Sequence, residues 1–392
     1  MKTIFSLLLS ALLVIAGCKE KQAPKPHLEI TTLFQDEREP YRAVILNECI
    51  VKIKDGQLSF FSNSGEPLFE LNDKDLVVSE DLYYKPDGYI IIGKKSGDKT
   101  LYAYYDLKGN QITGFRFEYA SPFDGDYAPV KEKGKLLIIN RKGETVATTD
   151  YKLIYPFQNG QAIASTANGY AVINTKGEIV KPLPWLGSGT KDDTRYDIHE
   201  ERIFNNILVV LVPGEGYGAV DLDGKEVIPC VYNFYDIYGQ GDNSVFIFEK
   251  TDKENAEQPL TYHCYDINGK RLFGDMEILG VNGAACGKIA INVVDPQDKD
   301  LTETWICSVT GEKMHKVYGR NSVTTPFYNG QAFGITTSFP GVNAVFYGII
   351  DTAGNVWDTL EYTNLFDYNG YFARVDDKEH ELQYVKVQRI VK

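Results

Sequence analysis

Residues 217–232 read YGAVDLDGKEVIPCVY and contain the pattern that decides the fold. An apolar run ends in Asp221, two residues follow, and Gly224 and the charged Lys225 lead into a second apolar run. An Asp or Asn side chain can accept hydrogen bonds from backbone amides further along a turn, and glycine adopts the left-handed conformation that closes it. The stretch therefore predicts a β-hairpin with Gly224 in its turn.

The same pattern occurs eight times, so the sequence is an array of repeats. Successive turn glycines are 34 to 47 residues apart, and in the first copy the Asn falls one place later. These glycines are Gly65, Gly109, Gly143, Gly177, Gly224, Gly269, Gly311 and Gly354.

A second element precedes the turn in several repeats. We expect its Phe to cap the core, its Asn-Gly or equivalent to turn the chain, and its Ala to begin the next strand. It occurs at residues 122–128 (PFDGDYA), 156–162 (PFQNGQA), 326–332 (PFYNGQA) and 365–373 (LFDYNGYFA).

Together the two elements resemble the WG-repeat family, whose units read roughly Phe-x-Asn-Gly-x-Ala-x-Val, Trp-Gly-x-Ile-Asp-x-x-Gly and Val-Ile-x-Pro-x-Tyr. Residues 217–232 match almost throughout, while residues 347–351 (YGIID) and 170–174 (YAVIN) match the middle part. Tyr replaces the signature Trp in these copies, and Gly follows it in only two of them. The resemblance covers about residues 100–375, implies a β-repeat fold, and says little about chemistry.

Each repeat holds four short strand-like runs, the last of them before the next Phe-x-Asn-Gly element. Four strands in about 40–45 residues is the size of a propeller blade. We therefore predict an all-β protein, a β-propeller of about seven or eight four-stranded blades. Residues 382–390 look like an unpaired strand that residues 28–33 could complete, which would close the ring. The alternative is an open, twisted array of the same hairpins, because the repeat lengths are uneven.

The N-terminus has the layout of a secretory signal. Lys2 precedes an apolar run of residues 4–15, which is shorter than the about 20 residues of a spanning helix, and Ala16 and Gly17 come directly before Cys18. Residues 15–18 resemble the bacterial lipobox, which implies cleavage before Cys18, diacylglycerol on its sulfur and an acyl group on the new amino terminus. An ordinary signal peptide followed by a chance cysteine is the alternative.

The sequence thus divides into a lipoprotein signal peptide (residues 1–17), a polar tether (18–27) and a β-repeat domain (28–392). Membrane attachment through Cys18 predicts a lipid-anchored protein of the cell envelope. Lys19, rather than Asp, follows the cysteine. By resemblance to Gram-negative lipoproteins, this implies the outer membrane.

Composition limits the partners. Without residues 1–17 the chain has 40 basic and 54 acidic residues, a net charge of −14. This argues against sequence-independent nucleic-acid binding, which needs clustered basic charge. We expect a monomer that binds a protein or a glycan. Five further cysteines lack C-x-x-C spacing, and we expect most of them to be buried. One disulfide between two of them is possible, but the spacing does not identify the pair.

No motif indicates catalysis, a metal or a cofactor. The five histidines form no H-E-x-x-H, and neither a phosphate-binding loop nor Gly-x-Ser-x-Gly occurs. Residues 214–218 (GEGYG) link two strands rather than open a helix, and the calcium-like start at Asp221 has Tyr232 where a bidentate Glu is needed. We predict a non-enzymatic binding or scaffolding module; the alternative is a propeller enzyme that cleaves a glycan with a pair of rim carboxylates.

A four-strand meander alternates its connections between two rims. The Asp/Asn-x-x-Gly turns lie on one rim, and the longer insertions lie on the other, which we call the variable rim. Loop insertions often mark the binding face of a repeat protein, although acidic hairpin tips can also be solvated ends that merely prevent edge pairing. The candidate binding residues on this rim are Trp185, Asp192, Asp193, Arg195, Tyr196, His199, Asp295, Asp298, Asp300 and Phe339.

Overall fold

The computed structural model shows a protein built from β-strands. It describes residues 27–35, 42–45, 49–54, 56–62, 65–78, 88–187, 195–199, 202–239, 241–250, 260–295, 298, 302–317, 321–323, 327, 330–336, 346–360, 364–368, 372–376 and 382–390. Within these ranges the only helical element is the short 3-10 turn Gly241–Asn243. No helix in the described part of the chain is long and apolar enough to cross a membrane.

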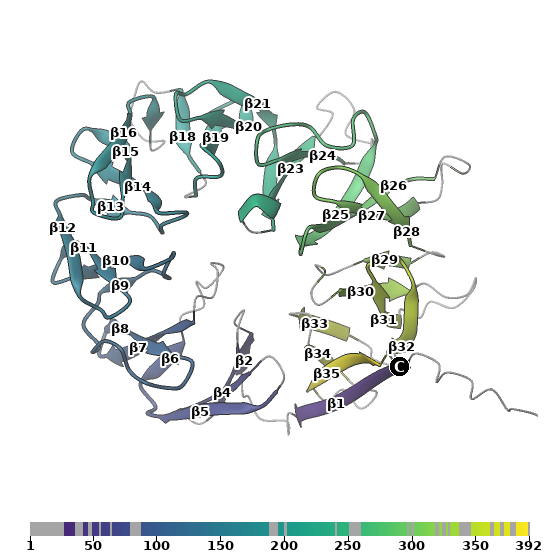
Figure 1. The fold of residues 1–392 in the computed structure, drawn as a ribbon, viewed down its shortest axis with the longest axis horizontal. Coiled ribbons are helices and arrows are strands. Elements are labelled where there is room, and N and C mark those ends of the chain that lie inside the picture. Colours follow the sequence, from purple (N-terminus) through teal and green to yellow (C-terminus); the bar gives the residue numbers. More distant parts are fainter. Residues whose placement is uncertain are drawn as a thin grey trace, which may run out of the picture.

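The described strands form eight hydrogen-bonded sheets, each of them open. Figure 1 shows the sheets arranged around a ring in sequence order, with β9, β13 and β33 on the inner side and β12, β16 and β1 on the outer side. The repeat units are called blades and are numbered in ring order. The predicted all-β, propeller-like fold is confirmed.

The first four blades occupy residues 42–183. Blade 1 contains β2 (Arg42–Ile45), β3 (Cys49–Lys54), β4 (Gln57–Ser62) and β5 (Pro67–Asn72); blade 2 contains β6 (Leu76–Val78), β7 (Tyr89–Ser96) and β8 (Lys99–Asp106). Blade 3 contains β9 (Tyr119–Ala120), β10 (Tyr127–Glu132), β11 (Lys135–Asn140) and β12 (Thr145–Thr149); blade 4 contains β13 (Leu153–Ile154), β14 (Gln161–Thr166), β15 (Gly169–Asn174) and β16 (Ile179–Leu183).

The next three blades occupy residues 186–316, and blades 6 and 7 share one seven-stranded sheet. Blade 5 contains β17 (Leu186–Gly187), β18 (Tyr196–Ile198), β19 (Ile207–Val212), β20 (Gly216–Asp221) and β21 (Glu226–Tyr232). Blade 6 contains β22 (Phe234–Tyr238), β23 (Val245–Lys250) and β24 (Thr261–Asp266); blade 7 contains β25 (Ile278–Ala285), β26 (Lys288–Val294), β27 (Thr302–Ser308) and β28 (Lys313–Lys316).

The last two blades complete the ring. Blade 8 contains β29 (Asn321–Val323), β30 (Gln331–Thr336), β31 (Phe346–Asp351) and β32 (Val356–Leu360); blade 9 contains β33 (Asn364–Tyr368), β34 (Phe372–Asp376), β35 (Leu382–Ile390) and β1 (His27–Gln35). The described strands form eight sheets, in line with the predicted seven or eight, but nine repeat units. The numbers differ because blades 6 and 7 share a sheet, and counting Asp/Asn-x-x-Gly turns gives eight because blade 9 lacks one.

Strand β1 closes the ring, as the sequence predicted. It pairs antiparallel with β35, with Leu28 opposite Arg389 and Ile30 opposite Val387. Figure 1 shows this pairing where the purple and yellow ends of the colour scale meet. The pairing favours the closed ring over the open array. One detail differs from expectation: the strand before each Phe-x-Asn-Gly element pairs with the strand after it, as β13 does with β14, and so it begins a blade rather than ending one.

The Asp/Asn-x-x-Gly turns form as predicted. Asp221 Oδ1 accepts hydrogen bonds from the backbone amides of Asp223 and Lys225, both at 2.9 Å, and Gly224 has φ +79°. The same two-amide capture recurs in five other blades, at Asp106, Asn140, Asn174, Asp266 and Asp351.

Seven of the turn glycines also make room for the preceding blade. A Cβ on Gly224 would lie 2.8 Å from Cγ of Trp185, which follows the outer strand of blade 4. Four other turn glycines are equally crowded, with the nearest atom under 3.0 Å away in each case. The contacts join Gly109 to Phe69, Gly143 to Thr113, Gly269 to Val227 and Gly354 to Lys316.

The apolar core lies between blades. Buried Ile163 and Val172 of blade 4 belong to the same cluster as Val210 and Val220 of blade 5, and similar clusters join other neighbours. Four of the five cysteines outside the signal region, Cys49, Cys230, Cys264 and Cys307, are buried as expected, while Cys286 is exposed. Burial raises the pKa of the Cys230 and Cys307 thiols to about 12.

A directed chain of hydrogen bonds joins blades 5 and 6. The Arg271 guanidinium lies 3.1 Å from Nε2 of His263 and can only donate, so that nitrogen accepts and Nδ1 carries the proton. Nδ1 then donates to the Tyr232 hydroxyl at 2.8 Å, and Tyr232 donates to the Tyr265 hydroxyl at 2.6 Å. Burial lowers the pKa of His263 to about 4, and the positive charges of Arg271 and Lys250 act in the same direction.

Two hairpin glycines give a first prediction: Gly134, in the turn between β10 and β11, and Gly224. Gly134→Ala should cost about 1 kcal/mol of unfolding free energy, because Gly134 has φ +76° but no atom within 4 Å of the added Cβ. Gly224→Ala should cost about 1–3 kcal/mol more, since its Cβ must displace Trp185. Chemical denaturation measures both variants. Equal losses would show that the contact with Trp185 adds nothing.

The histidine gives a second prediction. Above pH about 6.5 the imidazole is neutral in the folded and the unfolded chain; as the pH falls towards 4, only the unfolded chain takes up the proton, so stability falls. His263→Gln removes this titration, so the variant should lose less stability than the wild type between pH 6.5 and 4. Urea denaturation across this window measures the difference, and parallel curves for the two proteins would contradict it.

Candidate functional site

A pocket of about 260 Å³ lies where loops of blades 3, 4, 5 and 6 come together. Three of its walls are the loops that contain the Phe-x-Asn-Gly elements or their equivalents. The fourth is formed by β22 and the described residues between β22 and β23. The described lining residues are Pro122, Phe123, Asp124, Pro156, Phe157, Gln158, Asn159, Arg202, Phe204, Asp236, Ile237, Gly239, Gly241 and Ser244.

Local sequence explains how each loop is held. In blade 4, Phe157 is buried against the core, and Gln158 and Gln161 exchange backbone hydrogen bonds of 2.7 and 3.1 Å across a two-residue turn. Asn159 and Gly160 occupy that turn with φ of +52° and +76°. The Asn-Gly pair suits such positive angles, and it leaves Gln158 at the wall of the pocket.

Neighbouring loops are bonded to one another. Asp124 Oδ2 of blade 3 accepts a 2.9 Å hydrogen bond from the Gly160 amide of blade 4. Two walls of the pocket are therefore fixed relative to each other. Such a preformed site loses little conformational freedom when it binds a ligand.

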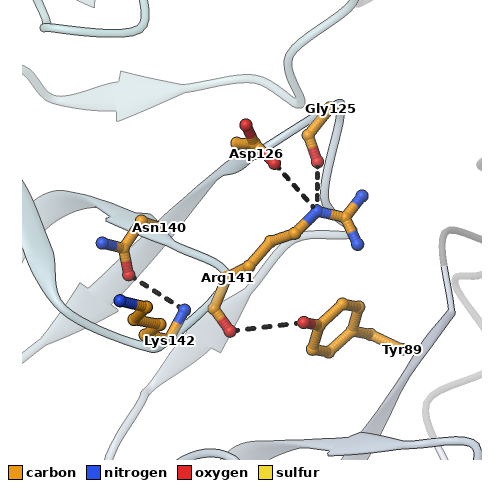
Figure 2. Close-up of polar contacts among 6 residues, drawn as sticks. All are labelled: Tyr89, Gly125, Asp126, Asn140, Arg141 and Lys142. Carbon is orange, nitrogen blue, oxygen red and sulfur yellow. Dashed lines mark hydrogen bonds and ion pairs between the residues drawn. The ribbon is translucent and has the colours of Figure 1, made fainter.

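Arg141 braces the blade 3 loop from the adjacent Asp/Asn-x-x-Gly turn (Figure 2). Its Nε donates to the Gly125 carbonyl at 2.7 Å and lies 3.3 Å from Asp126 Oδ1, while its own carbonyl accepts from the Tyr89 hydroxyl. The guanidinium carbon is 5.7 Å from the centre of the Phe123 ring. These contacts place the Asp/Asn-x-x-Gly turn of blade 3 and its pocket loop on the same rim, as the four-strand meander predicts.

Two residues that line the pocket each carry a buried polar atom without a partner among the described residues. These atoms are Oγ of Ser244, a residue that is 2% exposed, and Oε1 of Gln158. Ser244 follows the 3-10 turn, and its backbone amide donates to the Gly241 carbonyl at 3.1 Å. Buried polar atoms are nearly always paired, and these two exceptions are closed off from solvent, so they lie behind the surface of the pocket.

Charged groups at the pocket are mixed. The Arg202 guanidinium stacks on Phe204, 5.0 Å from the ring centre, whereas Asp124 and Asp236 contribute carboxylates. Asp236 Oδ1 accepts from the Ile237 amide at 2.7 Å. The pKa of the adjacent Tyr238 is raised to about 12, mainly by burial and further by Asp236. The described part of the chain contains no group of three or more His, Cys, Asp or Glu side chains arranged to hold a metal ion.

Three of the sequence-predicted residues meet in blade 5. Trp185 is half-buried against Gly224, and its ring meets that of Tyr196 edge-on at 6.0 Å. Arg195 forms a 3.0 Å ion pair with Glu215 and lies 5.5 Å from the Tyr196 ring centre. Burial raises the pKa of Tyr196.

Three other predicted residues are described. His199 contacts the hydroxyls of Tyr235 (3.1 Å) and Tyr217 (3.2 Å), and Asp295 and Asp298 follow β26 in blade 7. None of these described residues lines the pocket. Cys18, Asp192, Asp193, Asp300 and Phe339 lie outside the described residues.

Sequence reasoning missed the pocket because its walls are the structural Phe-x-Asn-Gly elements. The recurrence of polar residues directly after the buried phenylalanines, Asp124 after Phe123 and Gln158 after Phe157, was the available signal. Ser244 carries no sequence signal of its own.

The fold and the pocket define the chain as a β-propeller-type repeat protein with a small ligand-sized cavity on one rim. Comparison with known families makes the type more specific: the model of the WG containing repeat matches residues 102–135, 138–170 and 217–253. The chain therefore contains WG repeats, and the predicted resemblance is confirmed.

One solved structure supports the fold. A crystal structure of the eukaryotic initiation factor is 12% identical with a TM-score of 0.51, covering 85% of this chain and 90% of that chain. At this identity the likeness concerns the fold alone. The WD40 domain of SCAP from fission yeast is 10% identical with a TM-score of 0.38, covering 92% of this chain and 97% of that chain. No curated protein sequence matches the chain.

Proposed function

We propose that the protein is a non-catalytic binding module that is held at a membrane through lipidated Cys18 and takes a protein or glycan ligand in the pocket of blades 3 to 6. The observation that carries the proposal is the pocket itself, which four blades build and which combines phenylalanines with polar and charged side chains. The WG repeats and the propeller-like fold support a β-repeat binding module.

The chemistry of the pocket favours binding over catalysis. Histidine, cysteine and lysine are absent from its described lining, so Ser244 has no imidazole beside it of the kind that activates a serine nucleophile. Instead the lining combines phenylalanine rings with a few convergent polar groups, which is the usual composition of a ligand site.

The membrane part of the proposal rests on the N-terminal sequence. Cys18 is the lipid attachment point, and the residues up to His27, where β1 begins, form the tether. At about 3.3–3.6 Å per extended residue, the tether keeps the ring within roughly 30 Å of the bilayer surface. Lys19 supports the outer membrane of a Gram-negative cell. The ring would then meet ligands in the envelope or at its surface.

The binding proposal predicts which variants lose ligand. Gln158→Trp places a large ring in the pocket and should abolish capture of a ligand from a glycan array or an envelope protein extract. The triple variant Asp295→Asn, Asp298→Asn, Asp300→Asn on the variable rim should retain capture. The opposite pattern, with capture lost only in the triple variant and recovered at high salt, would place the binding surface on the variable rim.

The anchor predicts a localisation change. Cys18→Ala removes the lipid attachment point, so the protein should leave the membrane fraction, because stable anchoring needs the acyl chains. Cys286→Ala, which changes an exposed cysteine of the ring, is the control and should stay with the membrane. Equal membrane association of Cys18→Ala and the wild type would rule out the lipid anchor.

A further inference from the structure

We propose that the variable rim of blades 1 to 3 binds an acidic glycan, with one anionic group seated in a hollow between Lys54 and Lys74. This site is separate from the pocket of blades 3 to 6, which is formed by loops of the other rim. The inference is carried by the charge of the hairpin tips, by the hollow among them and by the place where the chain enters the ring.

The hairpin tips of blades 1 to 3 are basic, although the chain as a whole is acidic. Residues 54–57, 72–75, 94–99 and 131–135 contain eight lysines and five carboxylates, a net charge of +3, whereas the whole chain has −13 and its remainder therefore −16. Figure 1 shows blades 1 to 3 next to one another, so these lysines lie along one stretch of rim. We call them the basic sector: Lys54, Lys74, Lys94, Lys95, Lys99, Lys131, Lys133 and Lys135.

Contacts between side chains join the three tips. Lys94 Nζ of blade 2 lies 2.8 Å from Oδ2 of Asp73, in the connection from blade 1, and 5.9 Å from the centre of the Phe115 ring. Arg116 Nε lies 3.8 Å from Oε2 of Glu132 in blade 3. The hydrogen bond from Lys94 holds the pKa of Asp73 below its usual range. Two carboxylates of this stretch are therefore already neutralised by basic partners.

Most lysines of the basic sector remain open to an external anion. Apart from Lys94 and Lys131, none of them forms an ion pair with a residue that the structure describes, and all six are exposed. Their charges add on one surface and attract an anionic ligand.

A hollow of about 370 Å³ lies between the tip of blade 1 and the connection from β5 to β6. The two walls touch each other: a Cβ on Gly56, which has φ +81°, would lie 2.6 Å from Cα of Lys74. Lys54 belongs to one wall and Lys74 to the other, so the packing of the walls brings two basic residues to one preformed site. Its described lining comprises Lys54, Gly56, Gln57, Asn72, Asp73 and Lys74.

The lining suits a sugar acid better than a peptide. The ammonium groups of Lys54 and Lys74 can donate hydrogen bonds to a carboxylate or phosphate. Gln57 Nε2 donates to Glu70 at 2.7 Å, which leaves its amide oxygen for a hydroxyl group, and the exposed Asn72 amide can donate and accept. The described lining contains no aliphatic or aromatic residue, whereas protein interfaces depend on buried aromatic and apolar anchors.

The spacing of the charges argues against a nucleic acid. Duplex DNA carries one negative charge per about 1.7 Å, and the acidic remainder of the chain would repel so dense a polyanion. Packed sheets lie about 10 Å apart, so neighbouring blades present their lysines at roughly that interval. A glycan with an anionic group on each repeating unit has a lower charge density, which suits lysines spaced in this way.

The place where the chain enters the ring favours a glycan over lipid headgroups. Strand β34 ends at Asp376 on the variable rim, where Leu382 of β35 lies opposite it. His27 lies opposite Ile390, at the other end of β35, so the chain enters on the rim of the Asp/Asn-x-x-Gly turns. With the anchor proposed above, on which this step rests, that rim faces the bilayer. The basic sector then faces away from the membrane, towards polymers of the envelope or its surface.

The test uses the full-length protein in detergent solution, with polygalacturonate and hyaluronan as acidic glycans and dextran as the neutral one. Calorimetry should show binding of both acidic glycans and none of dextran. The affinity should fall when the salt concentration rises from about 50 mM to about 500 mM, because salt screens exposed charges. The double variant Lys54→Gln, Lys74→Gln should bind about 10-fold more weakly, since it loses charged hydrogen bonds.

The double variant Lys176→Gln, Lys270→Gln is the matched control. Both lysines are exposed in turns of the other rim, so the variant loses the same charge and should keep the affinity of the wild type. Both double variants should melt as the wild type does, because exposed side chains are changed. Equal losses of affinity in the two variants would show that only the net charge of the protein matters, and would overturn the site.

Other outcomes would also overturn the proposal. Failure of both acidic glycans to bind would do so, and polyglutamate or DNA that binds as tightly as they do would remove the glycan assignment. Gln158→Trp should bind the acidic glycans as the wild type does; if it does not, the glycan enters the pocket of blades 3 to 6, and the rim site fails while the binding function stands. Binding in solution does not depend on the anchor, which the fractionation of Cys18→Ala tests separately.

Discussion

The ring depends on the close contact between the turn glycines and the preceding blade. A blade has apolar surface on two faces and cannot bury either of them alone. Gly109, Gly143, Gly224, Gly269 and Gly354 lie so close to the neighbouring blade that a Cβ would come within 3.0 Å of its atoms. The absent side chain lets successive sheets approach closely, and the buried clusters between them follow from that approach.

The same approach builds the pocket. Because blades 3 and 4 are held close, Asp124 can reach the Gly160 amide, and because the turn of blade 3 lies beside its own pocket loop, Arg141 can brace Gly125. Binding groups thus come from several repeats, while the hairpin turns fix their positions. The cavity is a product of the repeat packing and needs no long insertion.

Local patterns explain what the sequence could predict. Asp221 and Gly224 predict a turn whose hydrogen bonds all lie within a few residues of the same segment. Residues 28–33 and 382–390 are recognisable in the sequence as strands without neighbouring partners. Trp185 shows the limit: its ring lies against Gly224, a contact that exists only because neighbouring blades pack together. Ser244 shows the same limit, since a serine is unremarkable until the packing of four blades leaves its hydroxyl without a partner.

The pairing of β1 with β35 also constrains the order of assembly. His27 lies opposite Ile390, so the first strand of the ring to emerge during synthesis or export must wait for the last. Contacts between such distant residues carry a large loop-closure entropy and form late in folding. The middle blades, whose contacts are between neighbours, can assemble progressively meanwhile. Until closure, β1 and β35 each present an open strand edge, so the slowest event in folding is also the one that removes the surface most prone to aggregation.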